Sequence, residues 1–188
     1  MWQPPTLDFP ETAPRPTVPK DMITQLRVAG VQVVLEKAGL SGVQKRLGGT
    51  IGHSGDGGEA LKWLCYSGAD TTGRWVLWLE SSEIAGGAID GFALRRLDQM
   101  AEVDRRCHAL PESEAGIELP VALRLGMTEM QVRNTLGAPT TTFRSTLIFE
   151  HEHQRSIRNK PYTVTNTVAL ALRGGVVFAI QVWRDTSS

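Results

Sequence analysis

Two histidines separated by a single residue, His151 and His153, are the side chains of this sequence best placed to do chemistry together. Alternate residues of an extended strand project from the same face, so both imidazoles could ligate one metal ion. Zinc needs a third and usually a fourth ligand. The candidates for these further ligands are Glu150, Glu152, His53 and His108. Because His53 or His108 would have to arrive from the other half of the chain, we expect a polar strand end, no metal site and no cofactor.

No catalytic constellation accompanies these histidines. The glycine-dense segment 48–58 lacks the Lys-Ser/Thr end of a phosphate-binding loop, and a helix rather than a strand is expected before it. Ser81, Ser82 and Glu83 fall in an expected hairpin turn without an evident base. The patterns Gly-x-Ser-x-Gly and His-Glu-x-x-His do not occur. We therefore expect a protein that is not an enzyme.

Composition narrows the classes of partner. The 188 residues carry 20 basic and 20 acidic side chains, so the formal net charge is zero and a nucleic-acid partner is not expected. No apolar run approaches the roughly 20 residues of a membrane-spanning helix, so no transmembrane segment is expected. A hydrophobic content of 41% is ordinary for a globular protein, and the length of 188 residues suffices for one core or two small ones.

The first 20 residues differ in character from the rest. Prolines are dense between residues 3 and 19 and no hydrophobic periodicity is visible, which predicts a flexible, partly extended arm. No signal peptide is recognisable. Two interpretations stay open: an exported protein whose signal has been removed, or a cytosolic protein with a loose N-terminus.

The sequence has two cysteines, Cys65 and Cys107. Cys65 lies in the middle of an expected strand, and Cys107 follows the last expected strand of the same half of the chain. A disulfide between them would tie this tail back onto its sheet and could contribute up to about 4 kcal/mol by constraining the unfolded chain. We expect this disulfide; two free, buried thiols in a reducing compartment are the alternative.

The C-terminal part of the sequence shows a clear order of elements. Thr128 is a candidate N-cap for a helix over 128–136, which Gly137 ends. A short strand at 121–123 precedes this helix, and strands at 146–153, 164–172 and 176–183 follow it. The last two strands alternate with period two on either side of the turn 173–175, which predicts a hairpin.

The same order recurs upstream in weaker form. Segment 39–49 repeats the spacing of two apolar residues four apart, with Val43 and Leu47 corresponding to Val132 and Leu136. A strand at 31–35 precedes it, and strands at 61–66, 74–80 and 87–95 follow. We therefore predict an α+β fold of two tandem units, each a short helix packed on a roughly four-stranded antiparallel sheet. The expected divisions are a flexible Pro-rich arm over 1–20, a first unit over 21–107, a linker over 108–116 and a second unit over 117–188.

The segment 126–139, with Gly-Met-Thr, then Val-Arg, then Leu-Gly-Ala-Pro, resembles the SmpA/OmlA outer-membrane lipoproteins of the β-barrel assembly machinery. Tandem use of the same topology is similar to the β-lactamase inhibitor protein fold. In that fold a helical segment packs on a four-stranded antiparallel sheet in each half, and the joined sheets form a concave saddle. The resemblance implies a binding protein of the cell envelope, either inhibitor-like or an accessory of envelope assembly.

Tryptophans supply the expected binding surface. Trp75 and Trp78 are three apart on one expected strand and therefore lie on opposite faces. We expect Trp75 in the core and Trp78 on an open sheet surface, together with Trp183 and Tyr66. Exposed aromatic side chains on a sheet face are enriched at protein interfaces. The alternative is that a connecting loop or the Pro-rich arm covers them.

These features together predict a monomeric, periplasmic or secreted bacterial protein that binds another protein through an open antiparallel sheet surface. The rival interpretation is a small-molecule or metal-binding protein that uses the cleft between the two units. In that case His151 and His153, with Glu150 or Glu152, are the expected ligands.

Overall fold

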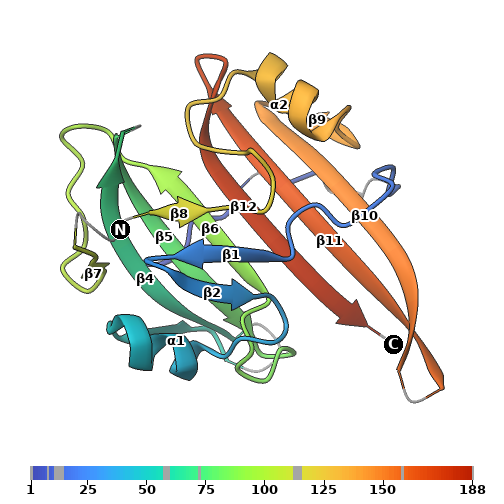
Figure 1. Ribbon diagram of the computed structural model, residues 1–188, viewed down its shortest axis with the longest axis horizontal. Helices are drawn as coiled ribbons and strands as arrows, with labels where there is room; N and C mark the ends of the chain where they lie inside the picture. Colours follow the sequence, from blue (N-terminus) through green and yellow to red (C-terminus); the bar gives the residue numbers. More distant parts are fainter. Residues whose placement is uncertain are drawn as a thin grey trace.

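The structure is a computed structural model that describes residues 2–7, 9–10, 15–56, 60–71, 73–111, 116–157 and 159–187. Antiparallel strands make up most of it (Figure 1). None of the helices in the described part of the chain has the length and apolar character needed to cross a membrane.

In the described part of the chain, one large sheet contains nine strands. Their order across the sheet is β3 (Ile51–Ser54), β4 (Leu61–Asp70), β5 (Gly73–Ser82), β6 (Gly91–Arg96), β12 (Val176–Ser187), β11 (Lys160–Arg173), β10 (Thr146–Ile157) and β9 (Thr141–Phe143). The short strand β7 (His108–Ala109) pairs in parallel with β4. The predicted hairpin is confirmed, because β11 and β12 join through Gly174 and Gly175, whose φ angles of 59° and 78° suit a tight turn between twisted strands.

A second, smaller sheet and two helices complete the fold. The small sheet has the order β2 (Val31–Val34), β1 (Gln25–Val28) and β8 (Ile117–Glu118), and lies over part of the large sheet (Figure 1). The helices α1 (Leu40–Leu47) and α2 (Glu129–Leu136) have eight residues each. Thr128 caps α2 as predicted, since its side chain accepts from the amide of Gln131 and the Gln131 side chain accepts from the amide of Thr128.

The predicted α+β class, with two tandem units that each pack a short helix on a roughly four-stranded sheet, is wrong. Strand β6 pairs with β12 from Gly91 to Arg95 against Trp183 to Ala179, so the strands of both halves form one continuous sheet. The two helices are short, and α2 fully buries only Val132. The small sheet contributes much of the apolar surface that packs on the large one, because Leu26, Val28 and Val33 belong to the same buried cluster as its side chains. The protein is therefore mostly β.

Period-two alternation gives the large sheet two different faces. The core face packs against the small sheet and both helices, and its buried side chains include Leu64, Tyr66, Trp75, Leu77, Leu79, Phe92, Ile180 and Val182. The opposite face is named the arm face here, because the N-terminal residues lie along it. Its residues include Trp63, Cys65, Val76, Trp78, Glu80, Ala93, Gln181 and Trp183.

The N-terminal residues wrap around one edge of the large sheet. Residues 2–7 and 9–10, named the arm, run along the arm face. At the sheet edge, the amides of Thr17 and Val18 donate to the carbonyl of Glu150 in β10. The chain then reaches the core face, where the amides of Met22 and Ile23 donate to the Asn166 side chain at 3.1 and 3.5 Å. One chain segment thus contacts both faces of the sheet.

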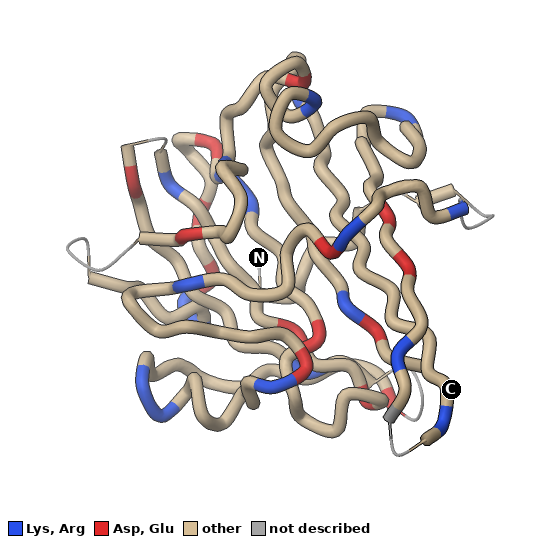
Figure 2. The backbone as a smooth tube through the Cα atoms, turned by 45° about the vertical axis from the view of Figure 1, so that its right-hand side comes forward, with Lys and Arg blue, Asp and Glu red and all other residues tan. Residues whose placement is uncertain are grey.

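Charged residues of both signs are interspersed over the fold. Figure 2 shows acidic and basic positions scattered among one another over the described strands and loops. This distribution agrees with a formal net charge of zero and gives no extended field of one sign to attract a polyanion.

Asn166 provides a direct test of how the chain is held on the core face. The Asn166 side chain has no solvent exposure and also donates to the carbonyls of Ile23 and Trp183. Asn166→Ala leaves several buried polar groups unpaired at about 1–3 kcal/mol each, so we expect the free energy of unfolding to fall by at least about 2 kcal/mol in chemical denaturation. Gln154→Ala, at an exposed position of β10, is the control and should change it by less than about 0.5 kcal/mol. An equally small change for Asn166→Ala would contradict this role.

Candidate functional site

The tryptophans lie on the two faces that their spacing predicts. Trp75 is in the core cluster, and Trp78 is on the opposite face with Trp63. Trp78 is not open to solvent as expected, however, because its side chain is completely buried. The arm covers it, which is the alternative that the sequence left open.

The other two expected surface residues differ from each other. Tyr66 has no exposure and lies on the core face opposite Leu77, because it is an odd number of residues from Trp63 and Cys65 on the same strand. Its hydroxyl donates to the carbonyl of Gly48 at 3.0 Å, and burial raises the pKa of Tyr66. Trp183 does lie on the arm face and is partly exposed, next to Phe9. Tyr66 therefore does not share a surface with Trp78 and Trp183.

Trp2 lies at one end of the arm face in a site formed by Trp63, Trp78 and Gly52, which is named the socket. The Trp2 ring meets Trp63 edge to face, with ring centroids 5.7 Å apart and an angle of 63° between the planes. Trp78 Nε1 donates to the carbonyl of Trp2 at 3.0 Å. Gly52 forms the floor, because a Cβ there would clash with the rings of both Trp63 and Trp2. Only glycine at this position leaves room for the two indoles.

A cation lies over the Trp2 ring. The guanidinium of Arg106 lies 4.9 Å from the centre of the Trp2 ring, an arrangement that favours a cation–π contact. Asp104 orients Arg106 by accepting from Nε at 2.9 Å and Nη2 at 2.8 Å, and these hydrogen bonds hold the pKa of Asp104 well below its usual range. The predicted Cys65–Cys107 disulfide is confirmed. It fastens Cys107, the residue after Arg106, to β4 beside Trp78.

Two further contacts hold the arm farther along the same face. The amide of Leu7 donates to Gln181 Oε1 at 3.3 Å, and the Gln181 side chain is almost fully buried. Phe9 meets Trp183 edge to face, with centroids 5.2 Å apart. The Trp183 indole packs closely on Gly91, where a Cβ would be only 2.8 Å from the ring. The strip of the arm face that the arm contacts, named the track, thus has an aromatic contact near each end and a hydrogen bond between them.

A buried carboxyl group lies under this track. Glu80 pairs in register with Trp63 on one side and Gly91 on the other, and only 3% of it is exposed. Burial, together with the nearby Asp90 carboxylate, raises the pKa of Glu80 to about 8. Asp90 itself accepts from the amide and hydroxyl of Ser82, and burial raises its pKa despite these bonds. Glu80 therefore carries a proton at neutral pH, and an uncharged carboxyl group suits an aromatic surface. Sequence reasoning assigned Glu80 no functional role, although its spacing of two from Trp78 puts both residues on the same face.

The histidine pair lies away from this track. His151 and His153 are on the core face of β10, where Asp21 approaches them. The expected partners Glu150 and Glu152 alternate with them and project to the other face. His53 and His108 lie on β3 and β7, at the far end of the large sheet from β10.

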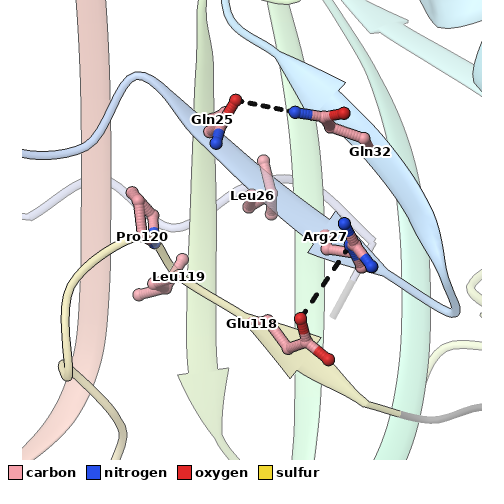
Figure 3. A pocket seen from close by; sticks show the side chains of 7 residues that line it. All are labelled: Gln25, Leu26, Arg27, Gln32, Glu118, Leu119 and Pro120. Atoms are coloured by element: carbon pink, nitrogen blue, oxygen red, sulfur yellow. Dashed lines mark hydrogen bonds and ion pairs between the residues drawn. The ribbon is translucent and has the colours of Figure 1, made fainter.

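A shallow pocket beside β1 and β8 offers little chemistry. In Figure 3 its polar side chains point at one another: Gln32 donates to Gln25 at 2.8 Å, and Arg27 lies 3.9 Å from Glu118. The Arg27 and Glu118 side chains are more than half exposed, so their ion pair is weak. This pocket is not a strong candidate for a functional site.

The raised pKa of Glu80 predicts a pH dependence of stability. Because the folded-state pKa of about 8 exceeds the ordinary value of 4.5, the folded chain retains a proton that the unfolded chain loses. Stability should therefore fall as the pH rises from about 5 to about 8. Glu80→Gln cannot ionise, so its melting temperature should fall less over this range than that of the wild type. A wild-type profile that rises between these pH values, or an unchanged slope in Glu80→Gln, would contradict this assignment.

Comparison with known proteins gives no family for the chain. No protein-family model matches it, and neither a curated protein nor a solved structure matches at a significant level. The resemblance to envelope lipoproteins and to β-lactamase inhibitor proteins stays a prediction, and function has to be argued from the geometry of the site.

Proposed function

We propose that this protein binds an extended segment of another protein along the arm face, and that its own arm occupies this face until the partner arrives. The observation that carries the proposal is the arm itself. An extended, proline-rich stretch lies across the sheet with Trp2 and Phe9 in contact with sheet tryptophans. It displays the kind of ligand that the track accommodates.

The chemistry of the track suits an aromatic and proline-rich ligand. Proline-rich segments are already extended before binding, so they lose little conformational entropy. Gly52 and Gly91 let indole rings lie close to the sheet, and Trp78 Nε1 and Gln181 Oε1 contact main-chain atoms of the arm. The main-chain contacts require no particular side chain, whereas the socket at Gly52 selects a large ring.

The contacts that hold the arm are modest enough to be exchanged. An edge-to-face aromatic pair contributes about 0.5–1.5 kcal/mol beyond area burial, and the arm makes one such pair near each end. Its strength comes from being tethered at Thr17 and Val18, which gives the arm an effective concentration in the millimolar range. A partner with more extensive contacts along the track would displace it.

The disulfide supports a location for this activity. A Cys65–Cys107 bond persists in oxidising compartments and is rare in the cytosol. The disulfide supports our proposal that the protein works in the periplasm or outside the cell, as a monomer whose arm folds onto its own sheet. The inhibitor-like role and the envelope-assembly role would both use the arm face, and the partner would be a protein of the same compartment.

Exchange of the arm can be measured with a labelled peptide of residues 1–10. In Trp2→Ala the tethered arm loses its socket contact, so the free peptide should bind full-length protein at least about tenfold more tightly than it binds the wild type. Adding Gly52→Ala fills the socket and should abolish this gain. Fluorescence anisotropy measures both affinities. Gln3→Ala, at an exposed position of the arm, is the matched control and should behave as the wild type.

Two results would contradict the proposal. One is peptide affinity that does not differ between the wild type and Trp2→Ala. The other is a tight complex that survives Gly52→Ala, which would place the peptide elsewhere on the protein. A concentration-dependent dimer of the wild type, with the arm of one copy on the sheet of the other, would replace the monomeric arrangement with an exchange between two chains.

A further inference from the structure

Two histidines and one aspartate converge where the chain wraps around the edge of the large sheet. Asp21 follows the edge segment, and His151 and His153 project from the core face of β10. One ring nitrogen of each histidine and one carboxylate oxygen all lie within 4.8 Å of one another. We propose that Asp21, His151 and His153 bind a divalent transition-metal ion of the zinc class. This site is separate from the arm face and does not depend on the binding function proposed for it.

Two buried atoms that no described residue pairs with point to an ion. His153 Nδ1 and Asp21 Oδ1 are both shielded from solvent and have no hydrogen bond within the described part of the chain. They lie 4.0 Å apart, which is too far for a hydrogen bond. Zinc bonds of about 2.0–2.2 Å in tetrahedral geometry separate neighbouring ligand atoms by about 3.4 Å, so a small approach of these two side chains would bring their atoms to that separation. A bound ion would satisfy both atoms, whose burial unpaired is otherwise costly.

The second histidine is already oriented as a ligand would be. His151 Nδ1 lies 2.7 Å from the carbonyl oxygen of Val18. A neutral imidazole that donates its Nδ1 proton to this carbonyl keeps its lone pair on Nε2. Metal-bound histidines commonly have this arrangement, in which the second ring nitrogen donates to a carbonyl or carboxylate. Val18 and Asp21 belong to one short segment, so the group that orients the ring and the acidic ligand arrive together.

The charged groups around the site have a net negative charge, which favours a cation. Arg184 Nη1 lies 2.7 Å from Asp21 Oδ2, and Arg184 Nε lies 3.0 Å from Glu36 Oε2. The arginine is therefore balanced by two carboxylates, and the group has a net charge of −1 when the histidines are neutral. Arg184 contacts Oδ2 of Asp21, so Oδ1 stays available to the ion. Thr186 donates to the other oxygen of Glu36 at 2.6 Å and fixes that carboxylate.

Three protein ligands leave one coordination position open. Tetrahedral zinc would complete its shell there with water or with a group from a partner. The His153 side chain is 36% exposed, so an ion can reach the site from solvent. Binding would also fasten Asp21 to β10 and so strengthen the edge at which the chain passes from one face to the other.

Metal binding is tested on full-length protein purified without an affinity tag and stripped with a chelator. Isothermal titration with Zn²⁺ should give one site, and excess Zn²⁺ should raise the melting temperature. Asp21→Asn and His153→Ala should weaken binding at least about tenfold. His53→Ala removes an exposed histidine on β3 and should leave the affinity unchanged.

A spectroscopic measurement decides the question even where a variant folds poorly. Co²⁺ added to the wild type should give visible d–d absorption that saturates at one equivalent and disappears on addition of Zn²⁺. Featureless Co²⁺ spectra of the wild type, or equal Zn²⁺ affinities for the wild type and Asp21→Asn, would overturn the proposal.

Discussion

The pairing of β6 with β12 is the interaction on which the rest of the structure depends. It joins the strands from both halves of the chain into one sheet, through the register of Ala93 with Gln181 and of Gly91 with Trp183. The arm face is continuous only because of this pairing. The socket at Trp63 and the site at Trp183 belong to strands on either side of the β6–β12 junction, so a single extended segment could not contact both if the two halves were separate.

The two ends of the N-terminal segment are held by different kinds of contact. Near residues 17–23 the main chain bonds to Glu150 and to the buried Asn166, and the proposed metal site would add a further link at Asp21. Near residues 2–9 the contacts are aromatic pairs and isolated hydrogen bonds to side chains. This difference suits a segment that stays attached near residues 17–23 while residues 2–9 detach. The surface under residues 2–9 is aromatic and contains the protonated Glu80, so an apolar segment of a partner could take their place.

Local patterns in the sequence predicted local structure well. The N-cap at Thr128, the hairpin at Gly174 and the opposite faces of Trp75 and Trp78 all follow from spacings of a few residues. The predicted Cys65–Cys107 disulfide is also confirmed. The choice of β6 and β12 as the strands that join the two halves, and their register, could not be predicted, because strand order in a sheet depends on contacts between residues far apart in sequence. Asp21 was missed for the same reason, since 130 residues separate it from His151.

Native-state hydrogen exchange is the most direct test of the central claim, that the arm lies on the sheet as an exchangeable segment fastened at the edge. The amide of Val18, bonded to Glu150 in β10, should exchange with a free energy close to that of the buried strands. The amide of Leu7, bonded to Gln181, should be protected but should open at a clearly lower free energy. Protection of Leu7 equal to that of the core would contradict displacement, and the absence of any protection at Leu7 would contradict the contact itself.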